Sequence, residues 1–126
     1  MASPPLPLAG VHILLVDDHD DGREMLAHLL QYSGALVTSA ATAEAALQVA
    51  STADIVVTDI RMPDHDGLWL LEQVRQRLGH MPVIALSAYS DLDLWQLQQS
   101  GFDRVLRKPV DPHQLVEAVT TLSRHR

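Results

Sequence analysis

Aspartate, serine and lysine side chains follow four of the five short apolar runs of this chain, and together they could transfer a phosphoryl group. Asp17 and Asp18 follow the first run, Asp59 the third, Ser87 the fourth, and Lys108 comes shortly after the fifth. Carboxylates brought together repel one another, so they require a cation, and an oxygen-only site suits Mg²⁺. A carboxylate beside Mg²⁺ and an ammonium can attack phosphorus, because the cations neutralise the phosphoryl oxygens. The pattern therefore predicts Asp59 as a nucleophile that forms an aspartyl phosphate.

Ser87, Ala88 and Lys108 are expected to complete this site. The Ser87 hydroxyl could hydrogen-bond a phosphoryl oxygen, and the small Ala88 beside it would leave room for the group to approach backbone amides. Lys108 is the only lysine among nine cationic residues, and arginine is used twice just before it. We expect its ammonium to pair with one oxygen of Asp59 at rest.

Five apolar, branched runs alternate with five helix-like stretches, which is the pattern of βα units around a parallel sheet. The runs are continuous rather than alternating, as expected for strands covered by helices on both faces. Asp111 and Pro112 mark the start of the last helix as its N-cap and first position. Ligands of such doubly wound α/β folds bind at the carboxyl ends of the strands, where these polar residues stand. The expected strands are 11–16, 35–39, 54–58, 82–86 and 104–106.

Composition limits the classes of function. The chain has 126 residues, 47% of them apolar and 20% charged, which fits one globular domain. Its net charge of −7 makes direct binding to nucleic acid unfavourable, and no apolar stretch is long enough to span a membrane. Residues 1–10 contain three prolines and no basic residue, so we expect a flexible tail or linker stub rather than a signal peptide. A cytoplasmic location is expected.

Taken in order, the motifs of this chain resemble the response regulator receiver domain. They are Asp17-Asp18, Asp59 followed by Met62-Pro63 and Gly67, Ser87-Ala88, and Lys108-Pro109. The resemblance spans residues 11 to about 123, and we draw the domain as residues 11–124. It implies a flavodoxin-like, five-stranded parallel sheet of order 2-1-3-4-5 with five helices. It also implies that Asp17, Asp18, Asp59 and the backbone carbonyl of Arg61 bind Mg²⁺, that Lys108 contacts the phosphoryl group, and that the Lys108–Pro109 bond is cis.

The same resemblance implies a role in a two-component or phosphorelay system. The phosphoryl donor would be a phosphohistidine of a sensor histidine kinase or of a histidine phosphotransfer protein, and Asp59 would be the acceptor. The domain would catalyse its own phosphorylation and slow dephosphorylation, and would switch a partner or output face. In that sense it is the substrate of a kinase more than an independent enzyme.

Val105 departs from the family's usual pattern, which has a tyrosine or phenylalanine at this position that moves inward on phosphorylation. Valine has no ring to move, so the coupling between Asp59 and an output face is open. On the expected fourth helix, Leu94 and Leu97 face the core, which turns Leu92 and Trp95 outward. We therefore expect Trp95 in a surface for an output domain or a homodimer. The alternative is a receiver-like interaction module that works without phosphorylation.

Other site chemistries fit the residues less well. A phosphatase of the haloacid dehalogenase type needs a second aspartate two residues after the nucleophile, where this chain has Arg61. His19 and His65 lie beside acidic residues, but hard oxygen ligands dominate the cluster and disfavour a transition-metal site. No phosphate loop of the flavodoxin kind follows the first strand. We interpret Trp69 and Phe102 as packing residues of the core or its edge.

Overall fold

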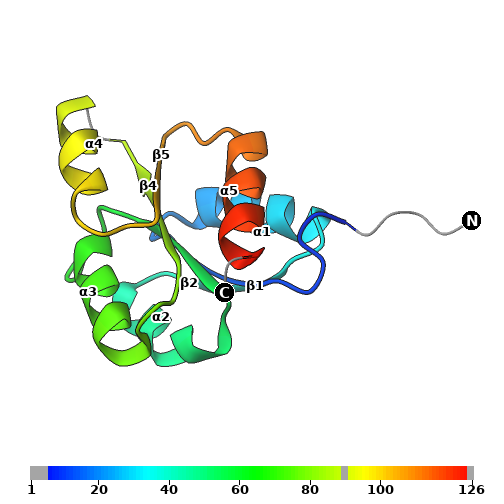
Figure 1. The fold of residues 1–126 in the computed structure, drawn as a ribbon, viewed down its shortest axis with the longest axis horizontal. Coiled ribbons are helices and arrows are strands. Elements are labelled where there is room, and N and C mark those ends of the chain that lie inside the picture. Colours follow the sequence, from blue (N-terminus) through cyan, green and yellow to red (C-terminus); the bar gives the residue numbers. More distant parts are fainter. Residues whose placement is uncertain (1–5, 89–90, 125–126) are drawn as a thin grey trace, which may run out of the picture.

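A five-stranded parallel sheet forms the centre of the molecule, with its strands in the order β2-β1-β3-β4-β5 (Figure 1). The computed structural model describes residues 6–88 and 91–124 of the chain. The predicted strand order is confirmed, and each predicted strand lies within one residue of the observed one at either end. The strands are β1 (His12–Val16), β2 (Leu36–Ala40), β3 (Ile55–Asp59), β4 (Val83–Ser87) and β5 (Arg104–Arg107).

Helices cover both faces of this sheet. Side chains of α1 and α5 pack on one face, and side chains of α2, α3 and α4 pack on the other (Figure 1). The predicted count of five α-helices is confirmed, and a short 3₁₀ turn, Ala50–Thr52, follows α2. The helices are α1 (Asp20–Tyr32), α2 (Ala43–Val49), α3 (Gly67–Leu78), α4 (Asp91–Gln98) and α5 (Pro112–Arg124).

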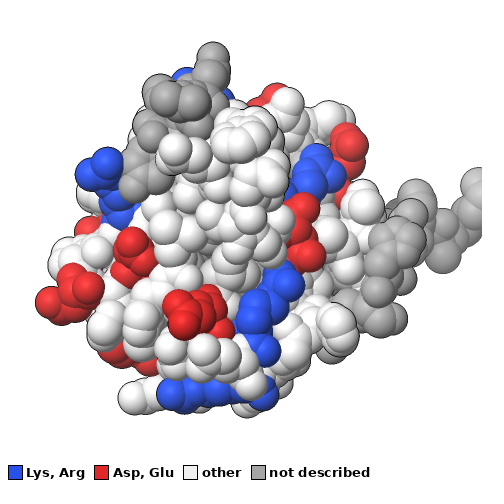
Figure 2. All heavy atoms as spheres, turned by 60° about the vertical axis from the view of Figure 1, so that its left-hand side comes forward, with Lys and Arg blue, Asp and Glu red and all other residues white. Residues whose placement is uncertain are grey.

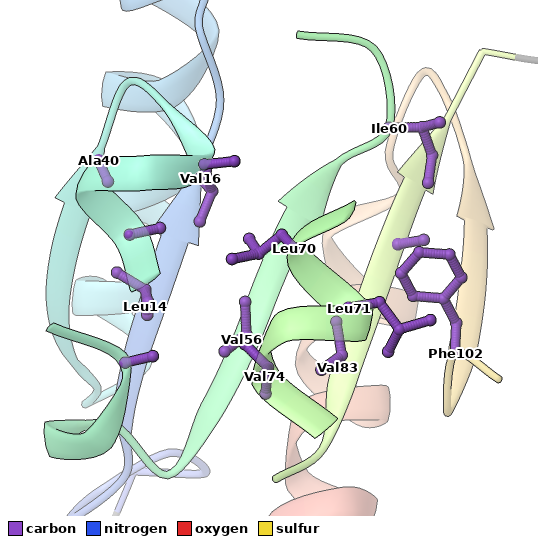
Figure 3. Close-up of a cluster of buried hydrophobic side chains, with 14 of the residues drawn as sticks. Leu14, Val16, Ala40, Val56, Ile60, Leu70, Leu71, Val74, Val83 and Phe102 are labelled. Atoms are coloured by element: carbon purple, nitrogen blue, oxygen red, sulfur yellow. The ribbon is translucent and has the colours of Figure 1, made fainter. Parts of the chain in front are cut away.

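The central strands are buried on both sides, which explains their continuous apolar sequence. In β3, Val56 packs on the α2 and α3 side, whereas Ile55 and Val57 pack on the α1 and α5 side. Figure 3 shows the first of these clusters, in which Val56 lies with Leu70 and Val74 of α3. Phe102 is 7% exposed and belongs to the same cluster, as predicted, because it fills space between α3 and the end of the sheet.

The packed part of the chain begins earlier than the sequence suggested. Residues 1–10 were expected to be a flexible tail, but Leu8 is fully buried in the cluster on the α1 and α5 side. Its backbone N–H donates to the carbonyl of Ser33 at 2.8 Å, which fixes this segment to the loop after α1. The boundary drawn at residue 11 is therefore corrected to include Leu8. The part of the expected tail at residues 1–5 lies outside the described residues.

The last helix begins as predicted. The carboxylate of Asp111 accepts a hydrogen bond from the backbone N–H of His113 at 2.9 Å, and Pro112 is the first helical residue. This cap satisfies one of the free amides of the first turn of α5. Among the described residues, none of the helices has the length and apolar character required to cross a bilayer.

Candidate functional site

Three polar side chains end up buried at the carboxyl edge of the sheet. Asp59 is the last residue of β3, Ser87 is the last residue of β4, and Asp17 directly follows β1. Their exposed fractions are 5%, 0% and 3%. Because β3 pairs with both β1 and β4, these three strand ends are neighbours. The strand order therefore brings together residues that are far apart in the sequence.

Lys108 closes the site from the side of β5. Its ammonium nitrogen Nζ lies 2.9 Å from Oδ1 of Asp59, which is the resting ion pair expected from the sequence. The backbone N–H of Lys108 donates to the carbonyl of Ser87 at 2.8 Å and so holds the loop after β5 against β4. The Lys108–Pro109 peptide bond is cis, as predicted.

The pKa of the Asp59 carboxyl is raised above its ordinary value. Burial is the largest cause, since it penalises the charged form, and the negative charge of Asp17 acts in the same direction. The hydrogen bond and charge of Lys108 and the backbone N–H of Ile60, 3.0 Å from Oδ1, act in the opposite direction. Lys108 thus opposes the effect of burial on the Asp59 carboxyl, although the net pKa stays above its ordinary value.

The acidic cluster can hold a divalent cation. Asp17, Asp18, His19 and Asp59 each offer a ligand atom, and these atoms all lie within 4.8 Å of one another. Oδ1 of Asp18 is a buried atom without a hydrogen-bond partner. A buried carboxylate oxygen of this kind is costly unless a hydrogen-bond donor or a cation binds it, and carboxylate oxygens are ligands that suit Mg²⁺. The residues therefore fit the ion that the sequence predicted.

A small hollow of about 200 Å³ opens over Asp59. It is lined by His19, Asp59, Ile60, Arg61, Ala88 and Lys108. Ala88 is exposed at its rim, in keeping with the space expected beside Ser87. Arg61 lines the same hollow as His19 and Asp59 of the acidic cluster, while the role of its carbonyl as a metal ligand stays a prediction.

Arg23 is a residue of the site that the sequence analysis missed. Its guanidinium nitrogen Nη1 donates to the backbone carbonyl of Asp17 at 2.7 Å, and Nη2 pairs with Oδ1 of Asp20 at 2.7 Å. Arg23 therefore fixes the loop that carries Asp17 and Asp18. The spacing of Asp20 and Arg23, three apart at the start of a helix, signals their ion pair but not the contact of Arg23 with the Asp17 carbonyl.

The two histidines considered for a metal site have different places. His19 lies in the acidic cluster, whereas His65 stacks on the ring of Trp69 with 3.9 Å between centroids and 13° between planes. Nε2 of His65 also lies 3.8 Å from Oε1 of Glu44 on α2. His65 thus packs the loop after β3 against α2 and α3. Trp69 packs at the edge of the core, as expected.

The predicted output face is only partly described. Trp95 is 60% exposed and Leu97 is 4% exposed, so on α4 Trp95 faces outward and Leu97 faces the core, as expected. The side chain of Leu92 lies outside the described residues. Val105 is half-buried at the edge of the core cluster on the α2 and α3 side. Figure 2 brings forward the side of the molecule on which α3 and α4 lie, where charged atoms surround an uncharged central stretch.

Known proteins are similar to this chain in sequence and in fold. The sequence profile of the response regulator receiver domain matches residues 13–120. The transcriptional regulatory protein FixJ of Azorhizobium caulinodans is 38% identical over 86% of this chain, and the DNA-binding transcriptional regulator NtrC of Escherichia coli is 37% identical over 90%. The chain spans only 52% of FixJ and 25% of NtrC. A receiver domain of a Francisella response regulator superimposes with a TM-score of 0.85 and 29% identity, covering 92% of this chain and 98% of its own.

Proposed function

Because the chain belongs to the response regulator receiver domain family, we propose that it is a phosphorylation-controlled switch in which Asp59 accepts a phosphoryl group. The observation that carries the proposal is the ion pair of the buried Asp59 carboxylate with Lys108, 2.9 Å apart and next to Asp17. A cationic partner on one side and a cation-binding cluster on the other are what a carboxylate needs in order to attack phosphorus.

In the transfer step, a carboxylate oxygen of Asp59 forms a bond to the phosphorus of a phosphohistidine. The bond between phosphorus and the imidazole nitrogen breaks, and its electron pair returns to the donor imidazole. Lys108 moves from pairing with the carboxylate to contacting a phosphoryl oxygen, and the hydroxyl of Ser87 donates a hydrogen bond to another. Ala88 leaves room for the group in the hollow over Asp59. In the slow dephosphorylation that completes the cycle, water attacks the phosphorus and the bond between phosphorus and the Asp59 oxygen breaks. Inorganic phosphate leaves, and Asp59 returns to the carboxylate form.

Asp17, Asp18 and Asp59, with the backbone carbonyl of Arg61, would hold Mg²⁺ at the site. When bound, the ion supplies charge neutralisation for the phosphoryl oxygens. Arg23 keeps the loop after β1 in place through the carbonyl of Asp17, so that the two aspartates face Asp59. His19 stands at the border of this cluster and the hollow.

A sensor histidine kinase or a histidine phosphotransfer protein is the proposed phosphoryl donor, and the cytoplasm the proposed location. The relatives FixJ and NtrC are named as transcriptional regulators, and in both the matched part is a fraction of a longer protein. A net charge of −7 opposes contact with nucleic acid by this domain itself. Its output is therefore proposed to pass through another domain, a partner protein or a second copy.

Phosphorylation by acetyl phosphate and Mg²⁺ tests the acceptor. The wild type should gain one phosphoryl mass, and Asp59→Asn should gain none. Asp64→Asn is the matched control, because it removes an exposed carboxylate of the same loop, and asparagine tolerates the left-handed backbone at this position, φ 68°. Mg²⁺-dependent labelling that persists in Asp59→Asn would refute the assignment.

Val105 supports the second candidate, an interaction module that does not depend on phosphorylation. A half-buried valine cannot make the ring movement that the family pattern uses, so Trp95 on α4 could form a permanent contact surface. Association with an output partner, or self-association, should be measured with and without acetyl phosphate for the wild type and Trp95→Ala. Tyr32→Ala is the control, because it removes an aromatic ring that is 86% exposed on α1. Loss of association in Trp95→Ala that is the same with and without phosphorylation favours the module.

A further inference from the structure

We propose that His19 supplies a nitrogen ligand to the cation held by Asp17, Asp18 and Asp59, and that it biases this site toward divalent first-row transition ions, such as Co²⁺, over Mg²⁺. The proposal rests on the metal site of the proposed function. It concerns a residue outside the all-oxygen ligand set that the sequence predicted.

The position of the His19 ring is the first observation. Nδ1 of His19 lies 3.3 Å from Oδ1 of Asp17 and 3.2 Å from Oδ1 of Asp18. Two ligands bound at right angles, each about 2.1 Å from an ion, are about 3.0 Å apart. The distances from the imidazole nitrogen to the two carboxylate oxygens are therefore close to the distance between neighbouring ligands of one octahedral ion.

The backbone around His19 favours this arrangement. The N–H of His19 donates to Oδ1 of Asp17 at 2.9 Å, which turns the residue back over the carboxylates. His19 is the N-cap residue of α1, but its side chain makes no capping hydrogen bond. The imidazole is therefore not needed to start the helix.

The unsatisfied oxygen of Asp18 is the second observation. Its Oδ1 lies 3.2 Å from the His19 nitrogen, yet it has no hydrogen-bond partner, while Nδ1 is within hydrogen-bonding distance of Asp17. A cation between the nitrogen and the two oxygens would satisfy all three atoms. The ring is 72% exposed, so it has the freedom to rotate by the small amount that this requires.

The chemistry of the nitrogen decides which ions benefit. Mg²⁺ binds carboxylates, carbonyls and water, and gains little from imidazole, whereas imidazole is a good ligand for later first-row ions. A site of three carboxylates and one imidazole should therefore bind Co²⁺ more tightly than the same site without the imidazole. Its affinity for Mg²⁺ should depend on the carboxylates alone.

Calorimetric titration of the full, tag-free chain with MgCl₂ and with CoCl₂ tests the proposal. His19→Gln should weaken Co²⁺ binding by about tenfold, the lower end of the effects seen around metal sites, and should leave Mg²⁺ binding unchanged. The visible absorption of bound Co²⁺ should also change in this variant, because a nitrogen ligand is lost. His28→Gln, which removes an exposed histidine from α1, the helix that follows His19, should behave as the wild type.

The other outcomes separate this inference from the proposed function. Unchanged Co²⁺ affinity in His19→Gln overturns the role of His19, and so does an equal loss of Mg²⁺ and Co²⁺ affinity, which would mean that His19 only supports the loop. A wild type that binds neither ion overturns the metal site and the inference with it. Mg²⁺-dependent labelling of the wild type by acetyl phosphate, with none in Asp59→Asn, tests the proposed function without any change at His19.

Discussion

The backbone carbonyl of Asp59 occupies the space where a side chain at Gly67 would begin. A Cβ atom on Gly67 would lie 2.5 Å from that carbonyl oxygen, and the N–H of Gly67 donates to the carbonyl of Ile60 at 2.8 Å. The first turn of α3 is thus packed directly on the end of β3, the strand that ends at Asp59. Glycine is required here by close approach of two backbone segments.

Gly67→Ala should therefore lower the free energy of unfolding by about 1–3 kcal/mol, because the backbone has to move to admit a methyl group. Urea denaturation measures this loss. Gly22→Ala is the control, since a Cβ at Gly22 in α1 would meet only Oδ2 of Asp17 at an ordinary 3.5 Å. Its stability should stay the same or rise by about 1 kcal/mol from the better helix propensity of alanine. Equal losses in the two variants would contradict the close-packing argument.

Asp59 should make the metal-free protein less stable as pH rises. Its pKa in the folded state is raised, chiefly by burial, so the folded protein holds this proton more tightly than the unfolded chain does. The stabilisation by the protonated form is complete below the unfolded pKa, about 4, and is lost as pH rises through the folded pKa. Asp59→Asn removes this titration. The free energy of unfolding of both proteins is measured in EDTA by urea denaturation, from pH 4 toward neutrality. The variant should become more stable relative to the wild type as the pH rises. A difference in unfolding free energy that stays constant with pH would contradict the prediction.

Lys108 should govern the rate of phosphoryl transfer. Lys108→Met removes the ammonium that lies 2.9 Å from Asp59, and the initial rate of labelling by acetyl phosphate should fall by about a hundredfold, as for the loss of one preorganised charge donor. Arg107→Gln removes the same charge from the preceding, exposed residue and should keep most of the wild-type rate. Labelling of Lys108→Met at the wild-type rate would contradict the role assigned to the ammonium.

The corrected start of the packed chain can be tested by a pair of leucines. Leu8→Ala should cost about 2–5 kcal/mol of unfolding free energy, because Leu8 is fully buried. Leu6→Ala, two residues earlier and 54% exposed, should change stability by no more than about 0.5 kcal/mol. Thermal or urea denaturation of both variants is the measurement. A Leu8 variant as stable as wild type would restore the view of this segment as a loose tail.

The sheet and the outline of the site could be predicted from the sequence because both depend on strong local patterns. Continuous apolar runs such as that of β3 occur where both faces of a strand are covered, and the carboxyl ends of neighbouring parallel strands must meet. Asp59 and Lys108 were therefore expected to meet once the strand order was assumed. The assumption itself came from family resemblance, since hydrophobic periodicity does not fix strand order.

Loop conformation was beyond the sequence, because it depends on contacts that no periodicity encodes. Leu8 stands between a proline-rich stretch and Gly10, so nothing distinguished it from an exposed tail residue. The contact of Arg23 with the carbonyl of Asp17 and the fold of His19 back over the carboxylates both follow from the path of one loop. The ion pair of Arg75 and Asp103, with 2.7 Å between Nη2 and Oδ2, likewise joins two positions that no sequence pattern relates.

The stacking of Trp69 on His65 gives the molecule an optical property. The chain has only two tryptophans, one stacked beside the loop that follows Asp59 and the other 60% exposed on α4. Replacing either indole leaves one tryptophan, which can be excited selectively over the two tyrosines. The fluorescence of Trp95→Phe then reports on the loop after Asp59, and that of Trp69→Phe reports on α4. Conformational changes near Asp59 and in α4 can thus be timed separately in an unlabelled protein. The delay between the two fluorescence signals would measure how fast a change at one region reaches the other.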